Sequence, residues 1–384
     1  MAIYQLTLPS VVRFGVGSLS TIGEEANKLA AKRALVITDP GVYAAGLTDP
    51  VKEQLSNAGL SVDVFPEAEP EPTYPRLNAA AEQFHEGNYD LLVGIGGGSS
   101  IDTAKGLSIL LTYGGKGQDY GGVDKVPAPG IPVFALPTTA GTGSEVTNIA
   151  IFTDLDRGIK LGIVSPYVIA RVALVDPTLT YGCPSKVTAA SGIDALVHAI
   201  ECYTGKKANT ITDALALEAM RLIAGNLRTA VKNGMDKEAR NRMSEGALLA
   251  GIAFSNSAVA AVHALAFALG SRFHVSHGLA NGLLLPYVTE FNLSANYPKY
   301  TTVAHMMGVD TEGLSPQEAA EQGLGAIKSL CADVGIPLRL RDLGVPKDAL
   351  EGMAVATMDV TRLVTNNPRE LTLDDVKGIW ENAW

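Results

Sequence analysis

The sequence predicts an α/β domain built on a parallel sheet, followed by an all-helical domain. Up to about residue 180, short β-branched runs alternate with longer amphipathic stretches, which is typical of a parallel sheet with helices on both faces. After about Pro184 the strand pattern disappears and only helical periodicity continues. No repeat or low-complexity linker separates the two patterns, so we expect two adjoining domains, residues 1–180 and residues 181–384.

The alternation defines the elements of the first domain. Strands are predicted at Ala34–Thr38, Val62–Phe65, Leu91–Ile95, Val133–Leu136 and Val172–Val175. Helices are predicted at Leu19–Lys32, Pro50–Ala58 and Tyr74–Glu86. Because ligands of such sheets lie beyond the carboxyl ends of the strands, the segments that follow the strands are candidate binding loops.

Helical spacing alone defines the elements of the second domain. Helices are predicted at Lys186–Tyr203, Thr212–Asn233, Lys237–Ser255, Ala258–Leu269, Ser315–Val334 and Thr372–Trp380. Ser315 begins its helix as an N-cap, with Pro316 at the first helical position and Glu318 at the third.

The composition indicates a folded, acidic chain. Of the 384 residues, 47% are hydrophobic and 18% are charged, and 30 Lys and Arg against 40 Asp and Glu give a net charge of −10. A charged fraction below the average of about 25% implies a large buried core and excludes disorder. The pI near 5.2 and the absence of a basic run argue against nucleic-acid binding.

The cysteines, the N-terminus and the apolar segments indicate the cellular compartment in which we expect the protein. The three cysteines form no CxxC pair, and the N-terminus carries no signal-peptide pattern, so we expect a cytoplasmic protein. The charge-free stretch Gly246–Ser271 is long enough to span a bilayer, but it is rich in Ala and Gly and contains polar residues. It therefore predicts a pair of buried helices and no membrane partner.

A glycine run follows the third predicted strand. Gly96, Gly97 and Gly98 lead into Ser99 and a new helix, whose first amides point at any bound phosphate. The run is neither G-x-G-x-x-G nor a P-loop, and a tight turn without a ligand is the alternative. Together with the segments below, it predicts a diphosphate cradle.

Two further segments of the first domain have the composition of a nucleotide site. Pro137–Thr147 follows the next strand and is rich in hydroxyls and glycines that suit phosphate and ribose oxygens, although an ordinary polar loop has the same composition. Asp39 ends the first predicted strand, where its carboxylate can accept from both hydroxyls of an adenosine ribose and would repel a 2′-phosphate. A helix N-cap ahead of Pro40 is the alternative for Asp39.

The second domain concentrates the candidate metal ligands. Asp194 and His198 lie four residues apart on one face of an apolar helix. Burying these polar side chains costs free energy, which either a hydrogen bond between the two or a shared metal ion can offset. With His263 and His277 they make a four-ligand set that suits divalent iron or zinc.

Two further histidines, His85 and His305, are not accompanied in the sequence by other candidate metal ligands. His85 is predicted to be a surface residue and His305 a packing residue.

Taken together, these motifs resemble the iron-containing (group III) alcohol dehydrogenase family, which includes lactaldehyde reductase and 1,3-propanediol dehydrogenase. The resemblance covers nearly the whole chain and implies a Rossmann-like first domain in a dehydroquinate synthase-like architecture. It implies the same metal ligands, with His277 also catalytic. The implied dinucleotide contacts are Gly97, Gly98, Ser99, Thr138, Thr139, Thr142, Thr147 and Lys160, with Val187 near the nicotinamide. Asp39, Gly96, Asp102 and Ser144 complete the predicted cofactor-binding set. The implied pocket walls are Ile149, Phe254 and Phe267, for which plain core packing is the alternative.

The chain departs from the family pattern at two positions. Many members have a second histidine where this sequence has Phe267, so we expect His274, or a water chain to the ribose hydroxyls, to carry the proton. Glu71 stands where many relatives have Asn, and a second carboxylate near Asp39 would further disfavour NADP.

The predicted function is reversible hydride transfer between NAD(H) and a small primary alcohol or aldehyde, with Fe²⁺ or alternatively Zn²⁺ as the metal. A zinc-dependent relative, such as a glycerol dehydrogenase or maleylacetate reductase, is the first alternative. A metal-dependent hydrolase or lyase of phosphorylated substrates and a non-catalytic nucleotide sensor are the others. The scarcity of surface charge predicts a homo-oligomer, a dimer or higher.

Overall fold

A computed structural model gives the structure of residues 3–384. The chain forms two compact units, which we call the α/β unit (Leu6–Tyr181) and the helical unit (Gly182–Trp384 with residues 3–5). The α/β unit is built on a six-stranded sheet in the order β1-β9-β6-β4-β2-β3, and every neighbouring pair is parallel. The strands are β1 (Val11–Phe14), β2 (Arg33–Ile37), β3 (Ser61–Phe65), β4 (Leu91–Gly96), β6 (Val133–Pro137) and β9 (Val172–Val175). The predicted parallel sheet is therefore confirmed.

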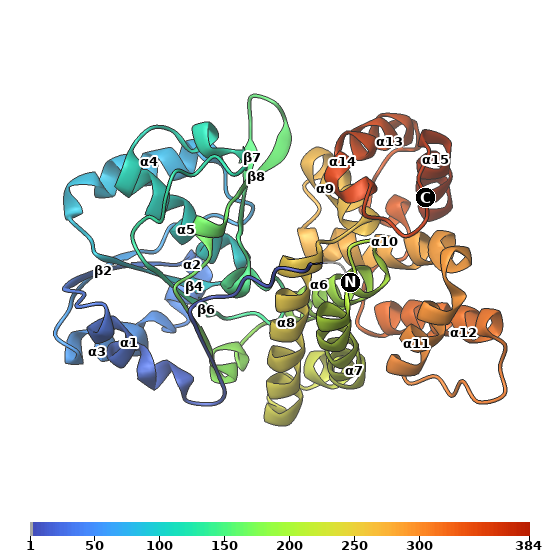
Figure 1. The fold of residues 1–384 in the computed structure, drawn as a ribbon, viewed down its shortest axis with the longest axis horizontal. Coiled ribbons are helices and arrows are strands. Elements are labelled where there is room, and N and C mark those ends of the chain that lie inside the picture. Colours follow the sequence, from blue (N-terminus) through green and yellow to red (C-terminus); the bar gives the residue numbers. More distant parts are fainter. Residues whose placement is uncertain (1–2) are drawn as a thin grey trace. The chain divides into compact units, whose positions relative to one another are not determined.

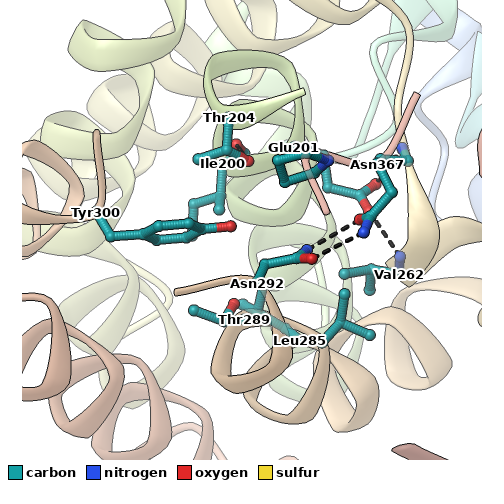
Figure 2. Close-up of a pocket in the computed structure, with 12 residues that line it drawn as sticks. Ile200, Glu201, Thr204, Val262, Leu285, Thr289, Asn292, Tyr300 and Asn367 are labelled. Atoms are coloured by element: carbon teal, nitrogen blue, oxygen red, sulfur yellow. Dashed lines mark hydrogen bonds between the residues drawn. The ribbon is translucent and has the colours of Figure 1, made fainter. Parts of the chain in front are cut away.

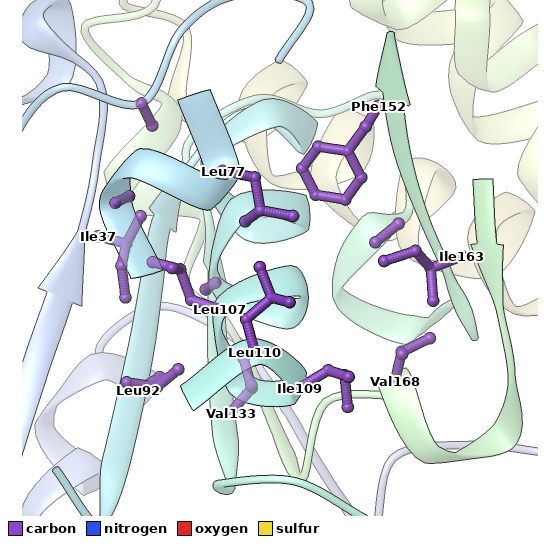
Figure 3. Close-up of a cluster of buried hydrophobic side chains, with 14 of the residues drawn as sticks. Ile37, Leu77, Leu92, Leu107, Ile109, Leu110, Val133, Phe152, Ile163 and Val168 are labelled. Atoms are coloured by element: carbon purple, nitrogen blue, oxygen red, sulfur yellow. The ribbon is translucent and has the colours of Figure 1, made fainter. Parts of the chain in front are cut away.

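Helices cover both faces of this sheet because successive side chains of each strand point to opposite sides. On β2, Leu35 and Ile37 join one buried cluster, which also contains Leu107 and Leu110 of α5 (Figure 3). Ala34 and Val36 join a second cluster on the opposite face. In Figure 1, α4 and α5 lie on one side of the sheet and α1 and α3 on the other. These helices are α1 (Ile22–Lys28), α3 (Thr48–Asn57), α4 (Tyr74–Phe84) and α5 (Gly98–Tyr113), and the short α2 is Pro40–Ala44.

A smaller sheet was not predicted from the sequence. β7 (Ile149–Asp154) and β8 (Ile159–Val164) form an antiparallel hairpin, and β5 (Gly122–Val123) pairs with β8. In β7, buried and half-buried residues alternate, so the hairpin lacks the continuous apolar run of the main-sheet strands. The hairpin carries Ile149 and Lys160, two of the predicted site residues.

The helical unit contains helices only among its described residues. They are α6 (Ser185–Thr204), α7 (Thr210–Lys232), α8 (Lys237–Ser257), α9 (Ala261–Phe273), α10 (His277–Asn292), α11 (Tyr297–Met306), α12 (Pro316–Asp333), α13 (Leu350–Asp359), α14 (Thr361–Val364) and α15 (Leu373–Ala383). The expected capping box at Ser315 and Glu318 is confirmed. The sequence did not predict α10, because Pro286 and two glycines, Gly278 and Gly282, interrupt it and weaken its helical pattern.

The charge-free stretch forms the end of α8 and most of α9, so the predicted pair of helices is confirmed. Among the described residues, no single helix has the length and apolar character to span a membrane. Taken together α8 and α9 reach that length, but the chain bends by 99° between them.

The C-terminal helix α15 packs on α13 and on α10, the helix that begins with His277. Its Trp380 is fully buried, and its indole N–H donates to the hydroxyl of Thr357 over 3.3 Å. Since the ring is enclosed, Trp380→Ala should lower the free energy of unfolding by about 3–5 kcal/mol.

Urea denaturation measures this loss. Trp384→Ala is the matched control, because it removes the other of the two tryptophans from a half-exposed position and should cost about 1 kcal/mol. Equal losses for the two variants would contradict the placement of Trp380 in the core.

Candidate metal and cofactor sites

The helix α6 presents Asp194 and His198 one turn apart, as the sequence predicts. Both side chains are buried, with exposures of 2% and 3%. The Nε2 atom of His198 lies 3.9 Å from one oxygen of Asp194, which is beyond hydrogen-bond distance. The simple Asp–His hydrogen bond is therefore not formed between these atoms.

The start of α9 and the start of α10 bring two more histidines to the same carboxylate. The other oxygen of Asp194 lies 3.9 Å from Nε2 of His263 and 3.7 Å from Nε2 of His277. One donor atom from each of Asp194, His263 and His277 lies within 4.8 Å of the others. His198 adjoins this triad, with its ring stacked on His263 at a centroid distance of 4.8 Å. Thus all four predicted ligands lie together, three of them in one compact set.

The donor set fits a divalent metal ion. Two ligand atoms that each lie about 2.1 Å from one metal are roughly 3–4 Å apart, close to the separations seen here. Among the described residues, the buried Nε2 atom of His263 has no hydrogen-bond partner, which is costly unless it binds a cation. One carboxylate with imidazole nitrogens is a donor set that iron and zinc both accept.

The charge of Asp194 is stabilised by its neighbours. Burial acts to raise the pKa of Asp194, but the imidazoles of His198, His277 and His263 and a hydrogen bond from Asn281 outweigh burial and lower it. The carboxylate is therefore ready to act as an anionic ligand at neutral pH.

Two residues that the sequence reasoning missed support this cluster. The carboxylate of Glu201 lies 2.6 Å from Nδ1 of His263, and the amide of Asn281 donates to Asp194 over 2.6 Å. The signal was periodicity, because Glu201 is seven residues after Asp194 on α6 and Asn281 is four after His277 on α10. Both therefore share a helix face with a candidate ligand.

Two aromatic rings flank the candidate ligands. Phe254 of α8 stacks on His198 at 4.6 Å, and Phe267 of α9 lies 5.6 Å from His277. Both are half-buried, so each presents part of its ring beyond the packed core.

The structure places the remaining histidines outside this cluster. His274 is exposed and ends α9 in the left-handed conformation, with φ of 54°. His85 is exposed, as expected. His305 is also exposed, so its prediction as a packing residue was wrong: it falls on the solvent side of α11, away from the buried Val303 and Ala304.

In the α/β unit, the glycine run and the threonine-rich segment lie against each other. A Cβ atom on Gly98 would come within 3.0 Å of Thr142, and one on Gly97 within 3.8 Å of Thr139. The N-cap of α5 is Gly97, which has no side chain to cap the first amides of the helix. Gly96 has φ of +150°, and a Cβ there would meet the hydroxyl of Ser100 at 2.4 Å, so only glycine fits this turn.

A buried ionic network holds the threonine-rich segment in place. The ammonium of Lys105 on α5 donates to the carbonyls of Thr147 and Ile149, each over 2.9 Å, and lies 3.3 Å from the Ser144 hydroxyl. The Asp102 carboxylate accepts from the Ser144 hydroxyl and from the N–H of Ile151. Burial lowers the pKa of Lys105 to about 8, against the opposing charges of Asp102 and a further carboxylate, Glu145.

The structure thereby separates the predicted cofactor residues into two groups. The first group keeps partly exposed atoms that a ligand could reach: Gly97, Gly98, Ser99, Thr139 and Thr142. The second group is buried beneath them: Gly96, Asp102, Thr138, Ser144 and Thr147.

Three further predicted cofactor residues belong to neither group: Asp39, Lys160 and Val187. One oxygen of Asp39 accepts from the N–H groups of Gly41 and Val42, so Asp39 is the N-cap of α2. Lys160 forms an ion pair with Glu71, whose negative charge is thus compensated within the hairpin region. Val187 is exposed in the first turn of α6.

A parallel sheet with a glycine loop is typical of nucleotide binding, and the carboxylate–imidazole cluster of the helical unit suits a divalent metal ion, so both are features expected of a metal-dependent dehydrogenase. Residues 9–177 match the family described as iron-containing alcohol dehydrogenase. Residues 188–384 match the C-terminal part of the Fe-containing alcohol dehydrogenase family. The chain therefore belongs to the iron-containing alcohol dehydrogenase family, and the resemblance seen in its motifs is confirmed.

Individual relatives match over nearly their whole length. The chain is 38% identical to the NAD-dependent methanol dehydrogenase of Bacillus methanolicus, with 98% of each chain covered. It is 41% identical to the 1,3-propanediol dehydrogenase of Citrobacter freundii, with 99% of each chain covered. A crystal structure of 1,3-propanediol oxidoreductase superimposes with a TM-score of 0.97 at 39% identity and 100% coverage of both chains.

The buried network makes a testable prediction. Lys105→Met keeps the apolar stem but leaves the carboxylates of Asp102 and Glu145 without their cation. Removing one partner of such a buried set should lower the free energy of unfolding by about 3–5 kcal/mol, measured by urea denaturation. Lys32→Met is the control, because Lys32 is exposed, and it should change stability by less than about 0.5 kcal/mol. A similarly small loss in Lys105→Met would show that the network does not stabilise the fold.

Proposed function

We propose that the protein is an NAD(H)-linked, metal-dependent alcohol dehydrogenase or aldehyde reductase acting on a small primary alcohol or aldehyde. One observation carries the proposal: the triad of Asp194, His263 and His277, in which Nε2 of the buried His263 has no hydrogen-bond partner among the described residues. The relatives' names support the reaction type. Since those names include both methanol and 1,3-propanediol, they do not define one substrate.

When bound, a divalent metal ion supplies a Lewis acid for the substrate oxygen, and nicotinamide supplies or accepts the hydride. Asp194, His198, His263 and His277 would hold the ion, with Asp194 providing the negative charge. The side chain of His277 is 29% exposed, against 4% or less for the other three, so the accessible side of the cluster lies at His277. Fe²⁺ is the metal favoured by the family, and Zn²⁺ suits the same donors.

The chain's own residues would bind and orient the two reactants. The accessible amides and hydroxyls from Gly97 to Ser99, with Thr139 and Thr142, would contact the dinucleotide phosphates. The buried residues Gly96, Asp102, Thr138, Ser144 and Thr147 would hold that loop in shape, which refines their predicted role as cofactor residues. Lys160 and Val187 are proposed cofactor contacts by family likeness.

Apolar walls would limit the size of the substrate. Phe254 and Phe267 lie against His198 and His277, so a substrate oxygen near the cluster would have its carbon atoms beside aromatic rings. Ile149, on β7 of the α/β unit, stays a predicted pocket residue by family likeness. A narrow, mostly apolar pocket favours short primary alcohols and excludes water from the reacting atoms.

Membership of a family of oxidoreductases removes the reasons for a hydrolase, a lyase or a nucleotide sensor. A cytoplasmic location and a homo-oligomeric state, dimer or higher, stay predictions from the sequence.

The reaction can be tested directly. The purified protein, loaded with Fe²⁺ without oxygen, should change nicotinamide absorbance with NAD and ethanol, 1-propanol or 1,3-propanediol, or with NADH and the matching aldehydes. Asp194→Ala should lower the affinity for Fe²⁺ by at least about 100-fold, since it removes the only anionic ligand. His305→Ala, an exposed histidine on α11, should bind metal normally. No absorbance change with any substrate, together with no NADH binding, would contradict the proposal, and elemental analysis decides between iron and zinc.

The cofactor preference can be tested at Asp39. Asp39→Asn keeps an N-cap for α2 but removes the charge that would repel a 2′-phosphate. The ratio of kcat/KM with NADP to that with NAD should rise by about fivefold, the effect of about 1 kcal/mol of repulsion between nearby charges in water. Asp49→Asn, on an exposed residue of α3, should leave the ratio unchanged. An unchanged ratio in Asp39→Asn would assign Asp39 to helix capping alone.

Proton transfer can be tested at His274, the proposed proton carrier in the short connection between α9 and α10. His274→Gln and His274→Asn should each lower turnover by about 100-fold or more and remove one limb of the pH profile. Asn tolerates the left-handed conformation of this residue, so it separates backbone strain from proton transfer. Intact turnover and an intact pH profile would leave the water chain to the ribose hydroxyls as the route.

A further inference from the structure

Glu201 contacts a candidate metal ligand on the side away from the cluster. Its Oε2 atom lies 2.6 Å from Nδ1 of His263, and both side chains are buried. The opposite ring nitrogen, Nε2, has no hydrogen-bond partner and lies 3.9 Å from Asp194. The imidazole of His263 thus lies between two carboxylates. Glu201 is hydrogen-bonded to Nδ1, and Asp194 lies at a distance from Nε2 that a metal ion can bridge.

The hydrogen bonds of Glu201 determine which ring nitrogen carries the proton. Oε2 also accepts from the N–H of Ala260 over 2.9 Å, and Oε1 accepts from the N–H of Val262 over 2.6 Å. A carboxylate whose oxygens all accept cannot donate to an imidazole, so Nδ1 of His263 must be the donor. The lone pair of neutral His263 is then on Nε2, which faces Asp194 and His277.

The same contacts link two helices that carry candidate ligands. Ala260 and Val262 lie at the N-terminus of α9, which no side chain of its own N-cap residue satisfies. Glu201 of α6 caps these N–H groups instead, because the positive end of the α9 helix dipole favours a carboxylate there. It therefore sets the position of α9, with His263, relative to Asp194 and His198 on α6.

The other side of Glu201 faces a small polar cavity (Figure 2). Its volume of about 10 Å³ is close to the room that one water molecule needs. Asn292 and Asn367 line it and satisfy each other through two hydrogen bonds of 2.9 and 2.7 Å. None of the residues that line the cavity is a lysine or arginine. The charge that balances Glu201 must therefore come from the side of His263.

The balance of buried charges also favours a cation at Nε2 of His263. Asp194 and Glu201 are two buried carboxylates whose only ion-pair partners among the described residues are histidines. Buried charges need opposite charges nearby, and a divalent cation on Nε2 of His263 would serve both carboxylates at once.

We infer that Glu201 is a positioning residue of the metal centre: it holds His263 with Nδ1 protonated, so that Nε2 is aimed at the ion shared with Asp194 and His277. This inference rests on the metal site of the proposed function. Partners of this kind orient a ligand and strengthen it as a donor.

The test compares Glu201→Ala, Glu201→Gln and wild type in two measurements. The first is the affinity of the metal-free, full-length protein for Co²⁺, a spectroscopic substitute for Fe²⁺, followed by its ligand-field absorption. Glu201→Ala should bind about 10–100-fold more weakly, with an altered spectrum. Glu201→Gln should lose less, because its carbonyl oxygen still accepts from Nδ1. The second is the tautomer of His263, read by ¹⁵N NMR of the metal-free protein, which should be Nδ1–H in wild type and change in Glu201→Ala.

Thr204→Val is the matched control. Thr204 lines the same cavity, and its hydroxyl donates to the carbonyl of Ile200, so its replacement should leave the Co²⁺ affinity and the tautomer unchanged. If Glu201→Ala does not fold, Glu201→Met replaces it in both measurements, because methionine keeps most of the side-chain volume but has no oxygen to accept from Nδ1.

The outcomes separate the inference from the proposed function. If wild type binds Co²⁺ and the Glu201 variants bind it equally well with an unchanged tautomer, Glu201 is a helix cap only, and the inference is overturned while the proposed function stands. If wild type itself binds no metal, the proposed function fails and the inference fails with it.

Discussion

The burial of Asp194 among three imidazoles is the interaction on which the helical unit depends. A carboxylate in an apolar core is tolerated only with compensating groups, and these come from three helices. α6 supplies His198 beside Asp194, while α9 and α10 supply His263 and His277 from their first turns. A further helix, α8, packs Phe254 against His198. The convergence of these helices is thus a requirement of electrostatics as much as of packing.

The two units solve the problem of buried charge in opposite ways. In the α/β unit, the cation is part of the protein, since Lys105 is fully buried between Asp102, the threonine-rich segment and Glu145. Burial raises the pKa of Glu145 to about 7, so this network is already close to neutral. In the helical unit, the carboxylates Asp194 and Glu201 have only imidazoles as ion-pair partners among the residues that the structure describes. One unit therefore has a closed network that shapes a loop, and the other has a cluster open to an external cation.

The main sheet and the long helices were predicted from the periodicity of hydrophobic residues, since elements such as β2 and α6 each follow one pattern along their length. It failed where local patterns were weak. β7 is a half-buried hairpin strand, and α10 contains Pro286, so neither has a continuous signal. Glu201 was missed for another reason: its helix position was evident, but its partner His263 is 62 residues away in the chain.

The sequence by itself determined the fold class, the glycine and threonine segments and the four candidate metal ligands, because each depends on residue type and short-range spacing. Only the tertiary structure decided how these residues divide their work. It showed that Asp102 and Ser144 lie in a buried network beneath the accessible glycines, that Glu71 is paired with Lys160, and that Glu201 supports His263. These contacts join residues far apart in the chain, and no local pattern encodes which distant partner a buried charge will meet.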